Sequence, residues 1–171
     1  MTCGRLGIPA DHAVQQRLLQ ATIHPANWTV EARSRNDSVS MSVLRLHFDG
    51  GKNKRGAYGS FELVEGENRY RRRLQFIGRH TSNEAEYLSL IAGLRFTLDH
   101  VEATGRNARN VQIAVFGDSL LVVRQVAGDW RTLNPRMAEL CEEARSLYGK
   151  FGEGSSIEWC SRNISVALLG H

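Results

Sequence analysis

The sequence of 171 residues has little of what stabilises small secreted proteins or membrane proteins. Its three cysteines, Cys3, Cys141 and Cys160, are odd in number and far apart, which suits neither a disulfide framework nor a zinc site. No apolar run is long enough to cross a bilayer, and the first residues do not resemble a secretory signal. We therefore expect a protein of the reducing cytoplasm.

The sequence also lacks a strong charge imbalance. Twenty-two Lys and Arg residues against 18 Asp and Glu give a net charge of +4 and a pI near 9.2. A mildly basic charge is compatible with a polyanionic partner such as nucleic acid, although many proteins without that role share it. The hydrophobic fraction of 42% is ordinary for a globular domain, and a chain of this length can bury a sizeable core.

The chain divides into two parts. Residues 1–40 carry no motif and end in a polar run, so we predict an N-terminal extension of unknown role, followed by one domain over residues 41–171. Alternating or continuous apolar residues predict strands over 42–49, 57–64, 69–77, 111–116 and 157–160. Helical spacing predicts helices over 82–104, 119–126 and 135–151, with a stub near 166–169. The predicted fold class is α/β: a mixed five-stranded sheet, three antiparallel strands and then parallel ones, with helices on its faces.

Three carboxylates stand at marked positions in this pattern. Asp49 ends the first strand before Gly50 and Gly51, which predict a tight turn, Asp118 follows the fourth strand, and Glu86 lies in the first helical turn. If the first and fourth strands are neighbours, the three acids converge, and Mg²⁺ or Mn²⁺ would neutralise their mutual repulsion. Two such ions would suit phosphodiester hydrolysis. Taken singly, an acid at such a position is usually a turn or helix-cap residue, and the three together with their flanking residues are much more specific.

Around these acids the chain resembles type 1 ribonuclease H, in the branch that lacks the basic protrusion and includes reverse transcriptase-like domains. The resemblance runs over about residues 43–170 in the family's order. It rests on Phe48-Asp49-Gly50-Gly51, Thr81-Ser82-Asn83-Glu84-Ala85-Glu86-Tyr87, Gly117-Asp118-Ser119-Leu120-Leu121-Val122-Val123, Gln125-Val126-Ala127-Gly128-Asp129-Trp130, Asn134-Pro135, and Ile157-Glu158-Trp159 with Arg162 and Asn163. It implies a ribonuclease H-like fold and an endonuclease that hydrolyses the RNA strand of RNA–DNA hybrids.

The resemblance also implies roles by position. Asp49, Glu86 and Asp118 match the catalytic acids that bind metal. The implied cofactors are two Mg²⁺ or Mn²⁺ ions when the RNA–DNA hybrid is bound. The implied substrate-binding residues are Gly50, Gly51, Ser82, Asn83, Ser119 and Arg162.

One departure from the family pattern bears on activity. The family's last helix carries a fourth acid in the pattern N-x-x-A-D-x-L, and aligned on Asn163 this chain has Ala167 at that position. A natural loss that weakens cleavage, compensation by another acid or by the substrate, and an engineered change all fit the sequence. The alternative function is thus a weakened or inactive ribonuclease H-like module that binds nucleic acid or a protein partner. A 3′–5′ exonuclease of the same fold is a third option, against which the paired glycines and the pair Ser82 and Asn83 argue.

Overall fold

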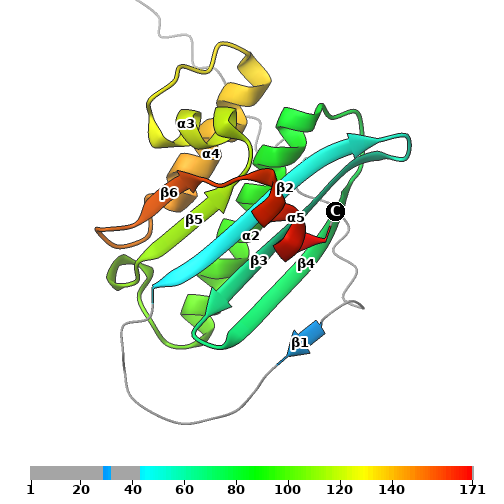
Figure 1. The fold of residues 1–171 in the computed structure, drawn as a ribbon. Helices are drawn as coiled ribbons and strands as arrows, with labels where there is room; N and C mark the ends of the chain where they lie inside the picture. The colour runs from blue at the N-terminus through cyan, green and yellow to red at the C-terminus, as the bar shows by residue number, and fades with distance from the viewer. Residues whose placement is uncertain (1–28, 32–42, 171) are drawn as a thin grey trace, which may run out of the picture.

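The computed structural model describes residues 29–31 and 43–170 of the chain, arranged around one sheet (Figure 1). Its six strands lie in the order β1-β4-β3-β2-β5-β6. Their bounds are β1 Thr29–Glu31, β2 Leu44–Asn53, β3 Gly56–Glu65, β4 Asn68–Phe76, β5 Ile113–Gly117 and β6 Ser156–Trp159. Strands β2, β3 and β4 form an antiparallel meander, and β5 and β6 continue the sheet in parallel with β2. The predicted mixed sheet is confirmed, and β1 adds an edge strand from the N-terminal extension by pairing antiparallel with β4.

The helices lie on both faces of this sheet. They are α2 Ser82–Ala103, the short 3-10 helix η1 Ala108–Asn110, α3 Leu120–Ala127, α4 Pro135–Tyr148 and α5 Arg162–Leu169. In Figure 1, α2 runs behind the sheet and α5 crosses in front of it. The predicted helices are all present, although α4 ends before Phe151 and α5 begins four residues before the predicted stub. Among the described residues, no helix combines the length and the apolar character that a membrane span requires.

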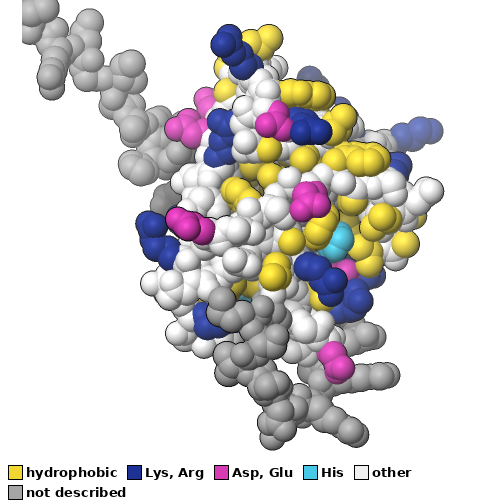
Figure 2. Space-filling view, turned by 60° about the vertical axis from the view of Figure 1, so that its left-hand side comes forward, with side chains coloured by type: hydrophobic (Ala, Val, Ile, Leu, Met, Phe, Trp, Pro, Cys, Tyr) yellow, Lys and Arg dark blue, Asp and Glu magenta, His cyan; other side chains and the backbone are white. Residues whose placement is uncertain are grey.

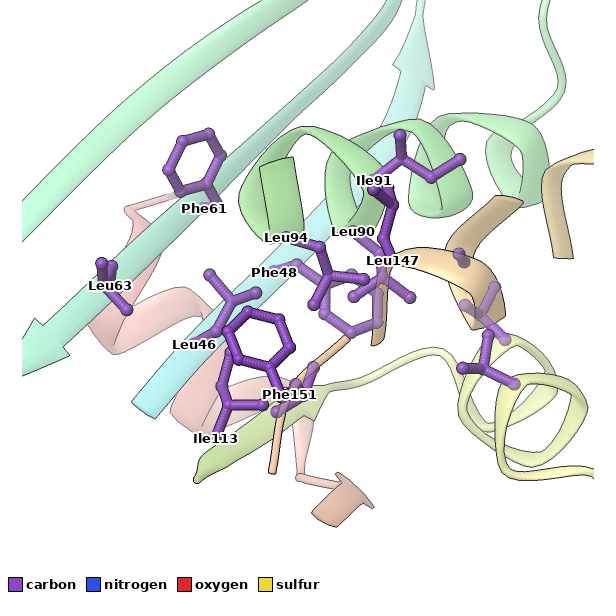
Figure 3. Close-up of a cluster of buried hydrophobic side chains, with 14 of the residues drawn as sticks. Leu46, Phe48, Phe61, Leu63, Leu90, Ile91, Leu94, Ile113, Leu147 and Phe151 are labelled. Carbon is purple, nitrogen blue, oxygen red and sulfur yellow. The ribbon is translucent and has the colours of Figure 1, made fainter. Parts of the chain in front are cut away.

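The main core lies between the sheet and α2 (Figure 3). Side chains from one face of β2, β3 and β5 interdigitate with an apolar stripe on α2 and with the end of the α4 region. The labelled members are Leu46, Phe48, Phe61, Leu63, Leu90, Ile91, Leu94, Ile113, Leu147 and Phe151. Because these side chains are almost fully buried, the core holds the start of α2 in a fixed position against β2.

The prediction of a tight turn at Gly50 and Gly51 is wrong. Strand β2 runs through both glycines, which pair with Gly59 and Tyr58 of β3, and the hairpin turns later, at Lys54 and Arg55. The reason lies in packing, because a Cβ at Gly50 would collide with the backbone of Ala85 in the first turn of α2. Glycine at this position lets a helix approach the strand closely, with no change of chain direction.

Candidate metal centre

The register of two parallel strands places Asp49 beside Asp118. The predicted pairing of the first and fourth strands is confirmed, and the last pair in the β2–β5 ladder is Phe48 with Gly117. Asp49, within β2, and Asp118, the residue after β5, come next along the chain, so the two acids lie at the same level of the sheet. A Cβ at Gly117 would collide with the ring of Phe48, so this register also requires a glycine.

Glu86, the fifth residue of α2, reaches the same point from the start of that helix. The helix begins at a capping box, in which the Glu84 amide donates to the Thr81 hydroxyl at 3.2 Å and the Thr81 amide donates to the Glu84 carboxylate at 2.7 Å. The close approach at Gly50 then brings this turn against β2. One carboxylate oxygen from each of Asp49, Glu86 and Asp118 lies within 4.8 Å of the other two.

Burial makes this cluster electrostatically unfavourable without a cation. Glu86 is only 8% exposed, and its buried Oε2 atom has no hydrogen-bond partner among residues 29–31 and 43–170. Burial, and then the charges of Asp49 and Asp118, raise the pKa of Glu86 to about 9, against a smaller opposing effect of the Gly50 amide and Arg162. Three carboxylates with an orphaned buried oxygen are a donor set that fits a hard divalent cation.

The segment after β6 closes one side of the cluster. The Trp159 indole donates to the Asp118 carbonyl at 3.0 Å, and the Cys160 amide donates to the Gly117 carbonyl at 3.0 Å. Arg162, at the start of α5, places a guanidinium nitrogen 3.4 Å from Asp118 Oδ2. The Asp118 side chain is thereby only 5% exposed, although it lies at the end of a strand.

The residues expected to contact substrate surround the cluster in different environments. Ser82 and Asn83 are exposed on the first turn of α2, and Ser119 is half-buried at the start of α3. Gly50 is buried with its amide directed to Glu86, whereas Gly51 is half-buried against Tyr58. Figure 2 shows the side of the molecule that carries β6, where acidic and basic side chains are interspersed with exposed hydrophobic ones. The net positive charge is therefore not gathered into a basic surface on this side.

Helix α5 contributes no acid to the cluster. Its eight residues, Arg-Asn-Ile-Ser-Val-Ala-Leu-Leu, include no carboxylate, and Ala167 is exposed to solvent. What the sequence reasoning missed is the contact between Arg162 and Asp118, which lie 44 residues apart. It also missed the capping box of Thr81 and Glu84, for which the spacing of the two residues was an available signal.

Comparison with known proteins identifies the family. The sequence profile described as reverse transcriptase-like matches residues 65–167. The structure of the RNase H1 from the halophilic archaeon Halobacterium salinarum NRC-1 is 30% identical and superposes with a TM-score of 0.59, covering 74% of this chain and 92% of that one. The chain belongs to the type 1 ribonuclease H family.

Other family members agree at different levels of similarity. The N-terminal RNase H domain of Rv2228c from Mycobacterium tuberculosis is 29% identical, with a TM-score of 0.59 over 74% of this chain and 87% of that one. The curated "Bifunctional protein Rv2228c" is 40% identical over 88 residues, which are 52% of this chain but only 22% of that protein. The structure of LC11-RNase H1 in complex with an RNA/DNA hybrid superposes with a TM-score of 0.62 over 72% and 89% of the two chains. At 21% identity it shows the shared ribonuclease H fold alone.

Proposed function

We propose that this chain is a metal-dependent endonuclease that hydrolyses the RNA strand of RNA–DNA hybrids. The observation that carries the proposal is the convergence of Asp49, Glu86 and Asp118, with a buried Glu86 oxygen that no group in the described part of the chain satisfies. Family membership supports the reaction class, and the hybrid bound by LC11-RNase H1 supports the substrate. The cytoplasm, which the cysteine usage favours, is the compartment that we propose for it.

In the proposed reaction, a water oxygen forms a bond to phosphorus and the bond from phosphorus to the 3′-oxygen breaks. The 3′-oxygen takes up a proton, and the products are a 3′-hydroxyl and a 5′-phosphate. Asp49, Glu86 and Asp118 would hold Mg²⁺ or Mn²⁺, which supplies activation of water and stabilisation of charge on the phosphate. The resemblance implies two such ions in the presence of substrate.

Selection of the RNA strand is assigned to the start of α2. The exposed hydroxyl of Ser82 and amide of Asn83 lie within four residues of Glu86, and both can hydrogen-bond a 2′-hydroxyl in the minor groove of a hybrid. Ser119 and Arg162 flank Asp118 and are proposed to contact the phosphates of the cleaved strand. Gly51 would let that strand approach β2, and the Gly50 amide keeps Glu86 oriented.

The test is cleavage of an end-labelled RNA–DNA hybrid by the full chain in Mg²⁺ and in Mn²⁺. We expect cut products with 3′-hydroxyl ends from the hybrid, none from duplex DNA, and none in excess EDTA. Asp118→Asn should reduce cleavage at least about a thousandfold, as expected when a ligand of a catalytic ion is lost. The control is Glu84→Gln, in the same helical turn as Glu86 but outside the cluster, which should retain cleavage. Absence of hybrid cleavage in both metals would contradict the proposal.

A second candidate function is favoured by one observation, the absence of any acid from α5. A weakened or inactive module would bind hybrid, or a protein partner, with little turnover. Retained binding of hybrid by the parent chain, without detectable cleavage in either metal, would support this candidate over the nuclease.

A further inference from the structure

The charges that meet at the cluster do not suit two divalent ions. Asp49, Glu86 and Asp118 contribute three carboxylates, and Arg162 contributes a guanidinium 3.4 Å from Asp118. With all three acids ionised, this set carries a net charge of −2, which one divalent cation neutralises. Without substrate, a second divalent cation would leave an excess of positive charge where the side chains of Glu86 and Asp118 are almost enclosed.

The position of Arg162 beside Asp118 is built into the fold. The two hydrogen bonds from Trp159 and Cys160 to the chain at Gly117 and Asp118 attach the end of β6 to the end of β5. Helix α5 starts two residues later, where the Ser161 carbonyl accepts the amide of Ile164 at 2.9 Å. Because Arg162 is the first residue of a helix attached in this way, its backbone is fixed next to the acid cluster.

The rest of α5 keeps that arrangement without adding a ligand. Ser165 and Leu169 are buried, 1% and 0% exposed, and the helix contacts β2 and β3. Its remaining turn presents Ala167 to solvent, so nothing on α5 offsets the positive charge of Arg162.

We propose that this site takes one divalent cation, and that the Arg162 guanidinium serves as the second positive centre beside Asp118. This inference rests on the proposed function. A guanidinium stays charged at every relevant pH and presents several N–H donors, so it can pair with a phosphate oxygen as charge develops there. Unlike a second ion, it cannot activate a water molecule. The attacking water therefore belongs with the single cation, and Arg162 acts on the phosphate.

The number of bound ions can be counted without any nuclease assay. The full chain, freed of metal with a chelator, is titrated with Mn²⁺, and free Mn²⁺ is measured by electron paramagnetic resonance. We expect one ion per chain. Arg162→Gln should tighten the first ion by about threefold to fivefold, the range of an exposed charge pair, and should admit a second, weaker ion. Arg162→Lys, which keeps the charge, should restore a single ion.

The control is Arg124→Gln, which removes another half-exposed guanidinium, paired with Asp129 away from the cluster, and should change nothing. Two ions on the parent chain, or an unchanged titration of Arg162→Gln, would overturn the inference and leave the proposed nuclease intact. One ion without hybrid cleavage would support a single-ion site but refute the nuclease, and with it the action of Arg162 on a phosphate. No bound ion would refute both. Arg162 is 68% exposed, so its substitution should leave the thermal unfolding midpoint nearly unchanged.

Discussion

Replacing Glu86 with glutamine should stabilise the metal-free protein, although it removes a buried residue of the candidate site. The carboxyl is buried, one of its oxygens has no partner, and two other carboxylates lie within 4.8 Å. At that separation, two unit charges repel by about 3 kcal/mol with an effective dielectric constant of about 20. Burial and this repulsion keep Glu86 protonated in the folded, metal-free protein at pH values where it is ionised in the unfolded chain, and the always neutral glutamine avoids that cost of protonation. Its amide can also donate a hydrogen bond to a neighbouring carboxylate.

The size of the effect follows from the shifted ionisation of Glu86. Its pKa is raised to about 9 in the folded protein from the ordinary value of 4.5. At pH values between these two, the folded state therefore binds more protons than the unfolded state does. The free energy of unfolding of the parent should therefore fall as pH rises through this window, at about 1.4 kcal/mol per pH unit. Between about pH 5 and about pH 8, the free energy of unfolding of Glu86→Gln should therefore rise relative to that of the parent by on the order of 4 kcal/mol.

The assay is urea unfolding in EDTA, followed by circular dichroism at both pH values. Glu84→Gln is the matched control, because Glu84 is buried in the same turn but accepts the Thr81 amide and pairs with Arg136 at 3.1 Å. The free energy of unfolding of Glu84→Gln should be about 1–2 kcal/mol lower than that of the parent at about pH 5 and at about pH 8, because these two interactions are weakened. In saturating Mg²⁺ the parent should become more stable than Glu86→Gln, since only the parent keeps all three carboxylates that would hold the ion.

Two results would refute this reasoning. One is a loss of stability in Glu86→Gln as large as that in Glu84→Gln, which would mean that the Glu86 carboxylate is satisfied in the folded protein. The other is a parallel pH dependence of the parent and Glu86→Gln, which would mean that Glu86 ionises normally.

Three further outcomes are expected. Gly50→Ala should destabilise the protein by about 1–3 kcal/mol in urea unfolding, because its Cβ would collide with the Ala85 backbone. Ala167→Asp should raise hybrid cleavage in Mg²⁺, measured by initial rates, if a fourth ligand limits turnover, and an unchanged rate would show that it does not. A chain starting at residue 41 should still cleave hybrid, with a lower unfolding midpoint from the loss of β1, and loss of cleavage would assign residues 1–40 a part in activity.

The order of strands and helices could be predicted because each element carries its own local pattern. The same holds for the position of Asp49 and Asp118, since each directly follows the segment through which β2 and β5 pair in parallel. The extra strand β1 could not be predicted, because its pairing with β4 joins residues about forty positions apart and Thr29–Glu31 carries no distinctive pattern. The contact of Arg162 with Asp118 was missed for the same reason: its cause is the attachment of β6 to β5.

The misinterpreted glycines explain how the site is assembled. A glycine pair after an acid has the same appearance in a sequence whether the chain turns or another element packs against it, and the partner that decides here, Ala85, lies 35 residues after Gly50. Gly117 has the equivalent role against Phe48. The elements that carry the three acids thus approach one another closely where a side chain is missing: α2 approaches β2 at Gly50, and β5 approaches β2 at Gly117. The acids supply the charge of the candidate metal centre, but these two glycines determine whether the carboxylates are close enough to share a cation.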